Sequence, residues 1–193
     1  ADISAIVTVA DDGGSSGRLR RELEIIPPGD LRMALAALAN SDPVGDLWAK
    51  TLQHRFGGNG AMAGHAVGNL MIAGLTDVLG DYQAALDTIA ELTNSQGRVF
   101  PVANQALDIE ADVAGLDDDP GSWFSSVLPH TLVPQVVEAI SASNALRVVV
   151  LNLSAEPGET PGFSAERHLH VLSQHAPDLR IDRILVDGAA LPS

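Results

Sequence analysis

The sequence of 193 residues contains no cysteine. Disulfide frameworks, thiolate zinc sites and cysteine nucleophiles are therefore excluded, and the absence fits a reducing compartment. Aromatic residues are also scarce, at 4%, although 46% of the residues are apolar. The apolar content thus comes mainly from Ala, Val, Leu and Ile, a composition that suits an α/β protein packed with small side chains.

Basic residues are few, since 11 Lys and Arg stand against 25 Asp and Glu. The formal net charge of −14 argues against general binding to nucleic acid or to anionic membranes. Any site for an anion must therefore be a local basic cluster. Long apolar runs are lacking too, and the first residues do not have the layout of a signal peptide. These features predict a soluble, cytoplasmic protein without membrane insertion.

The expected elements alternate between strands and helices. β-Branched apolar runs predict strands at 3–9, 147–153 and 180–187, and residues 99–113 are expected to be extended. Amphipathic and capping patterns predict helices at about 15–23, 44–54, 65–79, 82–93, 132–143 and 165–175. Ser15 or Ser16 is expected to cap the first helix, and Asp30 a further one with Leu31, Leu35 and Leu38 on one side. Gly80 is expected to end the helix at 65–79, and Asp81 to cap the next one. A strand, a polar loop, a helix and another strand form the βαβ unit of a parallel sheet, so the fold class is α/β.

The loop at 11–17 follows the first strand and reads DDGGSSG. In open α/β sheets, ligands bind at loops that follow the carboxyl ends of strands. The glycines let the backbone approach a ligand, and the positive end of the next helix points toward it. Asp11 and Asp12 can hold nearby arginines, accept hydroxyl groups or ligate Mg²⁺. Four arginines supply forked donors for phosphate or carboxylate: Arg18, Arg20, Arg21 and Arg32. The alternative is an ordinary turn beside a solvated helix face.

Two further segments carry candidate polar groups, and each has a purely structural alternative. His65 and Asn69 lie four residues apart, on one face of the helix expected at 65–79. Otherwise they are a capping histidine and an asparagine bonded within the core. The stretch PGSWFSS at 120–126 offers N–H groups and hydroxyls for a phosphate. Taken alone, a loop with a core aromatic pair is the favoured interpretation of that stretch.

The loop after the strand at 147–153 occupies the position where this architecture binds ligands. Its candidates are Asn152, Glu156, Gly158, Glu159 and Thr160. His168 and His175 of the following helix are interpreted as surface residues, because no cysteine or suitably spaced carboxylate accompanies them as a zinc ligand. No Ser/His/Asp set stands out among the candidate residues, so hydrolase chemistry is not supported.

Four blocks of the sequence together resemble one family. They are TVADDGGSSGRLRRELEIIPPGDLRMALAALA, HRFGGNGAMAGHAVGNLMIAGL, PGSWFSSVLPHTLVP and VVVLNLSAEPGETPGFSAERHL. In order and content they are similar to the signature blocks of YvcK-type proteins, the gluconeogenesis-factor or UDP-N-acetylglucosamine-binding branch of the CofD-like family. The high usage of Ala, Val and Arg resembles an actinobacterial member. The resemblance implies a Rossmann-like domain, a mostly parallel sheet flanked by helices, with a UDP-sugar bound in a cleft above the sheet.

The resemblance also implies which residues contact the ligand. Asp11, Asp12, Gly13 and Gly14 fall in the cleft, and Gly121, Ser122 and Ser126 fall in the loop expected to hold the diphosphate. His65 and Asn69 match the family's Gly-His-x-x-Gly-Asn helix start. Phe163 stands where many relatives have Tyr, as a stacking partner for the base. Arg18 and Arg32, two of the arginines around the first loop, belong to the same set. The loop after the strand expected at 147–153 completes it with Asn152, Pro157, Gly158, Glu159 and Thr160.

The chain departs from the family pattern in two places. The family begins with a strand and a Gly-rich loop, and this chain starts just after that unit. The family also has a longer segment before PGSWF, whereas here GLDDD runs straight into it. We therefore predict a single CofD-like nucleotide-binding domain over 1–193 that lacks the N-terminal βα unit and residues between Asp119 and Pro120. A backbone C-to-N separation there well above the ~1.33 Å of a peptide bond is the expected sign.

Three functions compete at this point. The first is a cytoplasmic UDP-sugar-binding regulator, not an enzyme, that links carbon metabolism during gluconeogenic growth with cell-wall synthesis and cell shape. It requires no cofactor, although Mg²⁺ can accompany the nucleotide. The second is a CofD-like phospholactyl or phosphoryl transferase, which the polar loop disfavours because a deazaflavin acceptor needs a broad apolar slot. The third is a scaffold that acts by protein contacts. A homo-oligomer, in the form of a dimer, is the expected assembly.

Overall fold

The computed structural model describes residues 3–108, 127–151 and 164–187. The chain divides into two compact units, Ala1–Asp108 and Ile109–Ser193. The predicted single domain over 1–193 stays a prediction. The proposed break between Asp119 and Pro120 lies outside the described residues.

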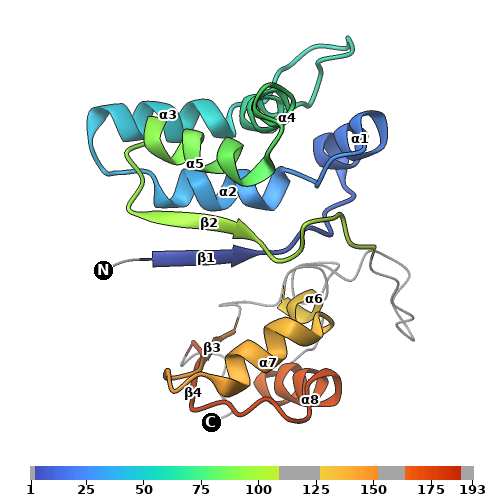
Figure 1. Ribbon diagram of the computed structural model, residues 1–193, viewed down its shortest axis with the longest axis vertical. Coiled ribbons are helices and arrows are strands. Elements are labelled where there is room, and N and C mark those ends of the chain that lie inside the picture. Colours follow the sequence, from blue (N-terminus) through green and yellow to red (C-terminus); the bar gives the residue numbers. More distant parts are fainter. Residues whose placement is uncertain (1–2, 109–126, 152–163, 188–193) are drawn as a thin grey trace. The chain divides into compact units, whose positions relative to one another are not determined.

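The first unit places helices α2–α5 on one side of a pair of parallel strands (Figure 1). Strand β1 (Ile3–Val7) pairs with β2 (Gly97–Pro101), with Ala5 opposite Val99. Helix α1 lies beyond the carboxyl ends of both strands in Figure 1. The helices are α1 (Gly14–Leu23), α2 (Gly29–Leu38), α3 (Pro43–Gln53), α4 (Val67–Leu79) and α5 (Tyr82–Leu92). The predicted parallel pairing is confirmed, and the second extended segment is shorter than the pattern predicted.

Local side-chain chemistry explains where several of these helices begin and end. The Asp42 carboxylate accepts hydrogen bonds from the N–H groups of Val44 and Gly45, at 2.9 and 2.8 Å, and caps α3. Gly80 ends α4 with φ +67°, the left-handed conformation that costs glycine least. Asp81 then caps α5, as predicted, by accepting from the N–H of Ala84. These three helix boundaries therefore follow from the chemistry of the residue at the boundary.

Two predicted caps are wrong. Gly13 is the residue that precedes α1, and Ser15 and Ser16 lie inside the helix as buried residues. Pro28 precedes α2, and Asp30 lies in the first turn. There a carboxylate still interacts favourably with the helix dipole.

The core of the first unit lies between the helices and the strand pair. The apolar stripe of α2 points into it, since Leu31 and Leu35 are inaccessible to solvent and Leu38 packs against the same cluster. The other buried members are Val9, Ile26, Leu52, Ile72, Leu86, Ile89 and Val99. Because burial of apolar surface is the main driving force of folding, this cluster holds α2, α4 and α5 over the strands.

The second unit contains another parallel pair, β3 (Val148–Val150) with β4 (Arg183–Leu185). Its helices are α6 (Leu128–Thr131), α7 (Pro134–Ala142) and α8 (Ala165–His175). The bounds of α8 agree with the prediction, and the Ser164 hydroxyl caps it by accepting from the N–H of Arg167. Leu128, Leu151 and Leu172 form the core of this unit.

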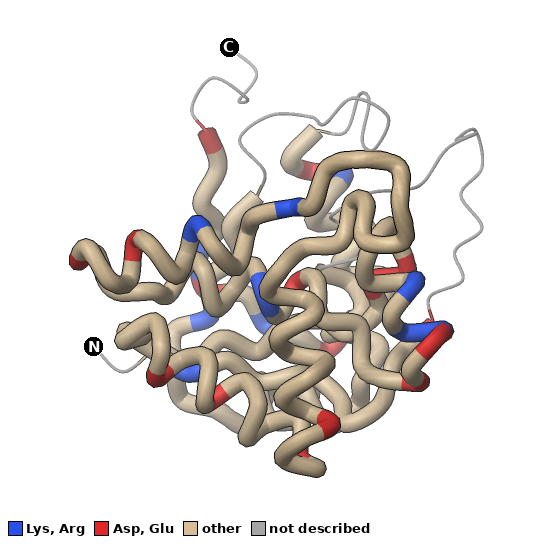
Figure 2. The backbone as a smooth tube through the Cα atoms, turned by 90° about the horizontal axis from the view of Figure 1, so that it is seen from above, with Lys and Arg blue, Asp and Glu red and all other residues tan. Residues whose placement is uncertain are grey.

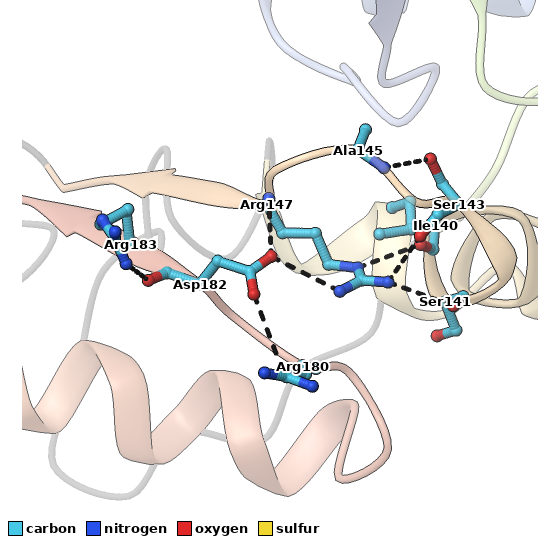
Figure 3. Close-up of polar contacts among 8 residues, drawn as sticks. All are labelled: Ile140, Ser141, Ser143, Ala145, Arg147, Arg180, Asp182 and Arg183. Atoms are coloured by element: carbon cyan, nitrogen blue, oxygen red, sulfur yellow. Dashed lines mark hydrogen bonds and ion pairs between the residues drawn. The ribbon is translucent and has the colours of Figure 1, made fainter.

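Arg147 fastens the end of α7 to the start of β3 (Figure 3). Its guanidinium donates to the carbonyls of Ile140, Ser141 and Ser143, at 2.8–3.2 Å, and so satisfies the carbonyls at the end of the helix. Its backbone N–H donates to the Asp182 carboxylate at 3.0 Å, and its guanidinium lies 3.4 Å from the same carboxylate. The backbone hydrogen bond, with the nearby arginines, lowers the pKa of Asp182. Asp182 therefore stays ionised and joins the starts of the two strands.

Candidate functional site

The loop between β1 and α1 presents an exposed turn at the start of a helix. Asp12, Gly13 and Gly14 are exposed, and Asp11 is half-buried. The N–H of Gly13 donates to the Asp11 carboxylate at 3.0 Å, which closes a tight turn. Among the described residues, no side chain caps the N-terminus of α1. The first amides of a helix have no partner within the helix, so this turn can offer N–H groups to an anion.

Two glycines let the loop pack closely against its surroundings. A Cβ atom on Gly17 would lie 2.0 Å from the backbone oxygen of Asp12. A Cβ atom on Gly29 would lie 2.2 Å from Asp11 Oδ2 and 2.4 Å from Ser16 Oγ. The Asp11 carboxylate therefore sits against the first residue of α2, and α1 folds directly back on the Asp12 peptide.

A buried polar cluster lies behind the exposed turn. Arg32 Nε donates to Asn69 Oδ1 at 2.9 Å, and Asn69 Nδ2 donates to Ser15 Oγ at 3.0 Å. Ser15 Oγ lies 3.0 Å from His65 Nδ1. All four side chains are buried, and the relative exposure is 1% for Asn69 and 3% for Arg32. The structure thus brings Arg32, His65 and Asn69 together, as the sequence predicted for a site, but as a packed network behind the loop.

Sequence reasoning missed the part played by Ser15. The serine was interpreted as a helix cap, whereas its hydroxyl joins His65 to Asn69 inside the molecule. The partners are 50 and 54 residues away in the sequence, so no local pattern identifies them. The available signal was a pair of serines flanked by three glycines. This pattern indicates that the backbone of the loop lies close to another part of the protein, but it does not identify that part.

The arginines around the loop have different roles. Arg18 donates to the carbonyl of Ala63 at 2.7 Å, and Arg55 donates to the carbonyl of Gly64 at 2.9 Å, so both hold the 55–66 segment. Arg20 pairs with Asp108, and Arg21 pairs with Asp12 at 2.9 Å. Acidic and basic positions are accordingly interspersed along the described chain (Figure 2). Of the predicted basic cluster, Arg18 and Arg21 remain partly or largely exposed beside the loop.

The environment of the cluster shifts two pKa values. Burial, with the nearby charge of Arg18, lowers the pKa of His65. Burial, with the charge of Arg55, lowers the pKa of Arg32, and the carboxylates of Asp11 and Asp30 oppose that shift. Arg32 stays charged, because an arginine begins far above neutral pH. His65 is neutral at pH 7, so its ring nitrogen can accept a hydrogen bond.

The lowered pKa of His65 predicts a pH dependence of stability. The unfolded chain binds a proton at this histidine near pH 6.5, while the folded chain stays neutral to lower pH. The free energy of unfolding should therefore fall as the pH drops through and below 6.5. Urea denaturation between pH 7.5 and 5.5 measures the slope, which His65→Gln should reduce and the exposed-site variant His170→Gln should not. Equal slopes in all three proteins would contradict the assignment.

Several predicted site residues lie outside the described residues. They are Gly121, Ser122, Ser126, Asn152, Pro157, Gly158, Glu159, Thr160 and Phe163. One prediction in the described part is wrong: His168 is buried, whereas His175 is exposed as expected. His168 lies one helical turn before Leu172, whose side chain is in the core, so both share the inner face of α8.

Neither a metal centre nor a membrane span is found in the part of the chain that the structure describes. Within 3–108, 127–151 and 164–187, no group of at least 3 His, Asp or Glu side chains is placed to hold a metal ion. None of the helices in these ranges combines the length and apolar content that a membrane span requires.

Comparisons with known proteins agree on one family. The family model described as 2-phospho-L-lactate transferase CofD matches residues 1–117 and 119–193. A gluconeogenesis-factor homologue of Mycobacterium tuberculosis is 50% identical over 240 aligned residues, which cover 99% of this chain and 70% of the relative. The gluconeogenesis factor of Bacillus subtilis is 37% identical, over 99% of this chain and 73% of the relative.

A solved structure supports the fold. The crystal structure of a UPF0052-family protein from Bacillus halodurans superposes with a TM-score of 0.82 at 36% identity, over 100% of this chain and 74% of that one. The alignments to the relatives are longer than the 193 residues of this chain. The relatives therefore carry residues within the aligned region that this chain does not have.

Proposed function

This chain belongs to the CofD family, and on that basis we propose that it is a cytoplasmic regulatory protein that binds a UDP-sugar. The preferred ligand is UDP-N-acetylglucosamine. The relatives are called gluconeogenesis factors, and we propose that this protein acts during growth on gluconeogenic carbon sources. In this role it couples carbon metabolism to cell-wall synthesis and cell shape.

The observation that carries this proposal is the exposed turn at the start of α1. It follows the carboxyl end of β1, where α/β sheets bind their ligands. The Gly13 N–H already donates to Asp11, but the amides that follow it in the first turn of α1 suit a diphosphate. The Asp11 and Asp12 carboxylates suit sugar hydroxyls or Mg²⁺. Arg18 lies within the same helix, and Arg21 lies in its last turn, where it pairs with Asp12. Their charges reduce the repulsion that a net charge of −14 imposes on an anion.

A thermal-shift titration with UDP-N-acetylglucosamine, UDP-glucose and GDP tests the proposal. A ligand at one hundred times its dissociation constant should stabilise the folded chain by about 2.7 kcal/mol. Gly14→Asp is the informative variant, because a side chain there meets open space and its carboxylate would repel a diphosphate. We expect it to weaken UDP-N-acetylglucosamine binding by about tenfold, or ~1.4 kcal/mol.

Gly80→Asp is the matched control. Gly80 also has a positive φ and open space around it, but it lies at the far end of α4. This variant should bind with the affinity of the wild type. The absence of a shift with every nucleotide would contradict the proposal and favour a scaffold that acts by protein contacts.

A second candidate function is phospholactyl or phosphoryl transfer. The observation that favours it is the matching family model, which is described as a transferase. In that reaction the loop arginines would stabilise phosphate charge, and Asp11 or Asp12 would hold Mg²⁺ or orient the acceptor hydroxyl. Product formation from a nucleotide donor would establish turnover, whereas binding without product supports the regulator.

A further inference from the structure

The buried polar cluster behind the turn has a direction. An arginine Nε can only donate, so Asn69 must present its oxygen to Arg32. The Asn69 Nδ2 group then faces Ser15, to which it donates. Ser15 Oγ keeps its proton and a second lone pair for the other partner, His65 Nδ1, which lies 3.0 Å away, and we infer that the proton points to this nitrogen. Each donor thus sets the orientation of the next group.

We propose that Arg32, Asn69, Ser15 and His65 form a one-way hydrogen-bond chain that fixes His65 as the tautomer protonated on Nε2 and positions the first turn of α1. This hydrogen-bond chain deepens the proposed function and rests on it, because the first turn of α1 carries the proposed anion site. Arg32 and Asn69, which the sequence placed among the ligand contacts, act through Ser15 and are positioning residues.

The geometry explains why the hydrogen-bond chain fixes the first turn of α1. Ser15 directly follows the exposed Gly13–Gly14 pair, and its hydroxyl is held from two elements, Asn69 of α4 and His65 of the preceding segment. Asn69 is in turn held by Arg32 of α2. A satisfied buried network of this kind specifies one arrangement, since any other leaves a buried polar group unpaired.

The Ser15–His65 pair also resembles an activated nucleophile with its base. The groups at the other end of the hydrogen-bond chain argue against that role. Activation needs a group that orients the base and stabilises its protonated form, commonly a carboxylate. Here the hydrogen-bond chain begins at a guanidinium, and Ser15 is 3% exposed. Burial and the charge of Arg18 disfavour the imidazolium and outweigh the opposing charge of Glu22, since the pKa of His65 is lowered. The arrangement therefore holds the hydroxyl in place instead of activating it.

The tautomer of His65 is directly measurable. Long-range ¹H–¹⁵N correlation spectra of the ¹⁵N-labelled chain at pH 7.5, assigned with His65→Gln, should show an unprotonated Nδ1 and a protonated Nε2. A wild-type spectrum in which His65 has a protonated Nδ1 would overturn the proposal.

Asn69→Asp tests the direction of the chain with a nearly isosteric change. A carboxylate accepts from both Arg32 and Ser15, so Ser15 Oγ would then accept from His65, and Nδ1 should become protonated. We expect the same variant to weaken UDP-N-acetylglucosamine binding by about tenfold, since the turn loses its fixed orientation and a charge is added beneath it. Asn144→Asp, at an exposed position of the second unit, should leave the tautomer and the affinity unchanged.

The outcomes separate this inference from the proposed function. A His65 tautomer that is unaffected by Asn69→Asp would overturn the hydrogen-bond chain, whatever the protein binds. A second outcome is that the wild-type protein shows the expected tautomer, and Asn69→Asp its reversal, while the wild type binds no UDP-N-acetylglucosamine. That result would support the hydrogen-bond chain and contradict the proposed ligand.

Discussion

Gly17→Ala should destabilise the chain by about 3 kcal/mol and abolish binding at the α1 turn. The added methyl group would lie 2.0 Å from the backbone oxygen of Asp12 and 2.6 Å from its carbonyl carbon. Neither atom is at the end of a flexible side chain, so the helix and the loop must separate. Because Gly17 also donates its N–H to Gly13, that separation displaces the turn itself. Urea denaturation followed by circular dichroism, with calorimetric titration of UDP-N-acetylglucosamine, measures both effects.

Gly74→Ala is the control for this prediction. Gly74 also lies within a helix, α4, but a Cβ atom there meets nothing within 4 Å. Alanine should stabilise that helix by about 0.5–1 kcal/mol, because it restricts the unfolded chain more than glycine does. If Gly17→Ala proved as stable as the wild type and bound the nucleotide equally, the close packing of α1 on the Asp12 peptide would be wrong.

The sequence predicted elements well where one residue decides a boundary. Asp81 caps α5 and Gly80 ends α4, both as expected, because the backbone amide of the cap and the left-handed φ are local requirements. The bounds of α8 were also predicted, and the Ser164 cap explains physically why the helix begins where it does. Parallel pairing followed from the order of strands and helices.

The errors arose where a distant partner overrides a local preference. A serine after a glycine turn is a good cap, but Ser15 instead bonds to His65 and Asn69, which no local pattern connects to it. His168 was predicted to lie on the surface because no metal-ligand partner accompanies it, although its spacing to Leu172 places it on the buried face. In the candidate site, the sequence pattern predicted a loop that joins the first strand to a helix, and the structure has one between β1 and α1. Only the structure shows that Arg32, Asn69 and His65 pack behind this loop, and the ligand contacts stay a prediction.

Leu35→Ala should lower the free energy of unfolding by about 2–5 kcal/mol while leaving the affinity of the folded chain for its ligand unchanged. Leu35 is inaccessible to solvent and lies in the core cluster of the first unit, so truncation leaves a cavity that rigid neighbours fill only in part. The side chain belongs to the same helix as Arg32, but its contacts are apolar and separate from the hydrogen-bonded cluster.

Leu47→Ala provides the comparison for the core prediction, because Leu47 is 63% exposed on α3 and its truncation should change stability by less than about 0.5 kcal/mol. Both variants are measured by urea denaturation, and affinity is measured at a temperature where each is folded. A loss of affinity in folded Leu35→Ala equal to that in Gly17→Ala would mean that core packing, and not the glycine contact, sets the shape of the turn. Unchanged affinity with lowered stability would show that the turn depends on the contacts of α1 with its own loop.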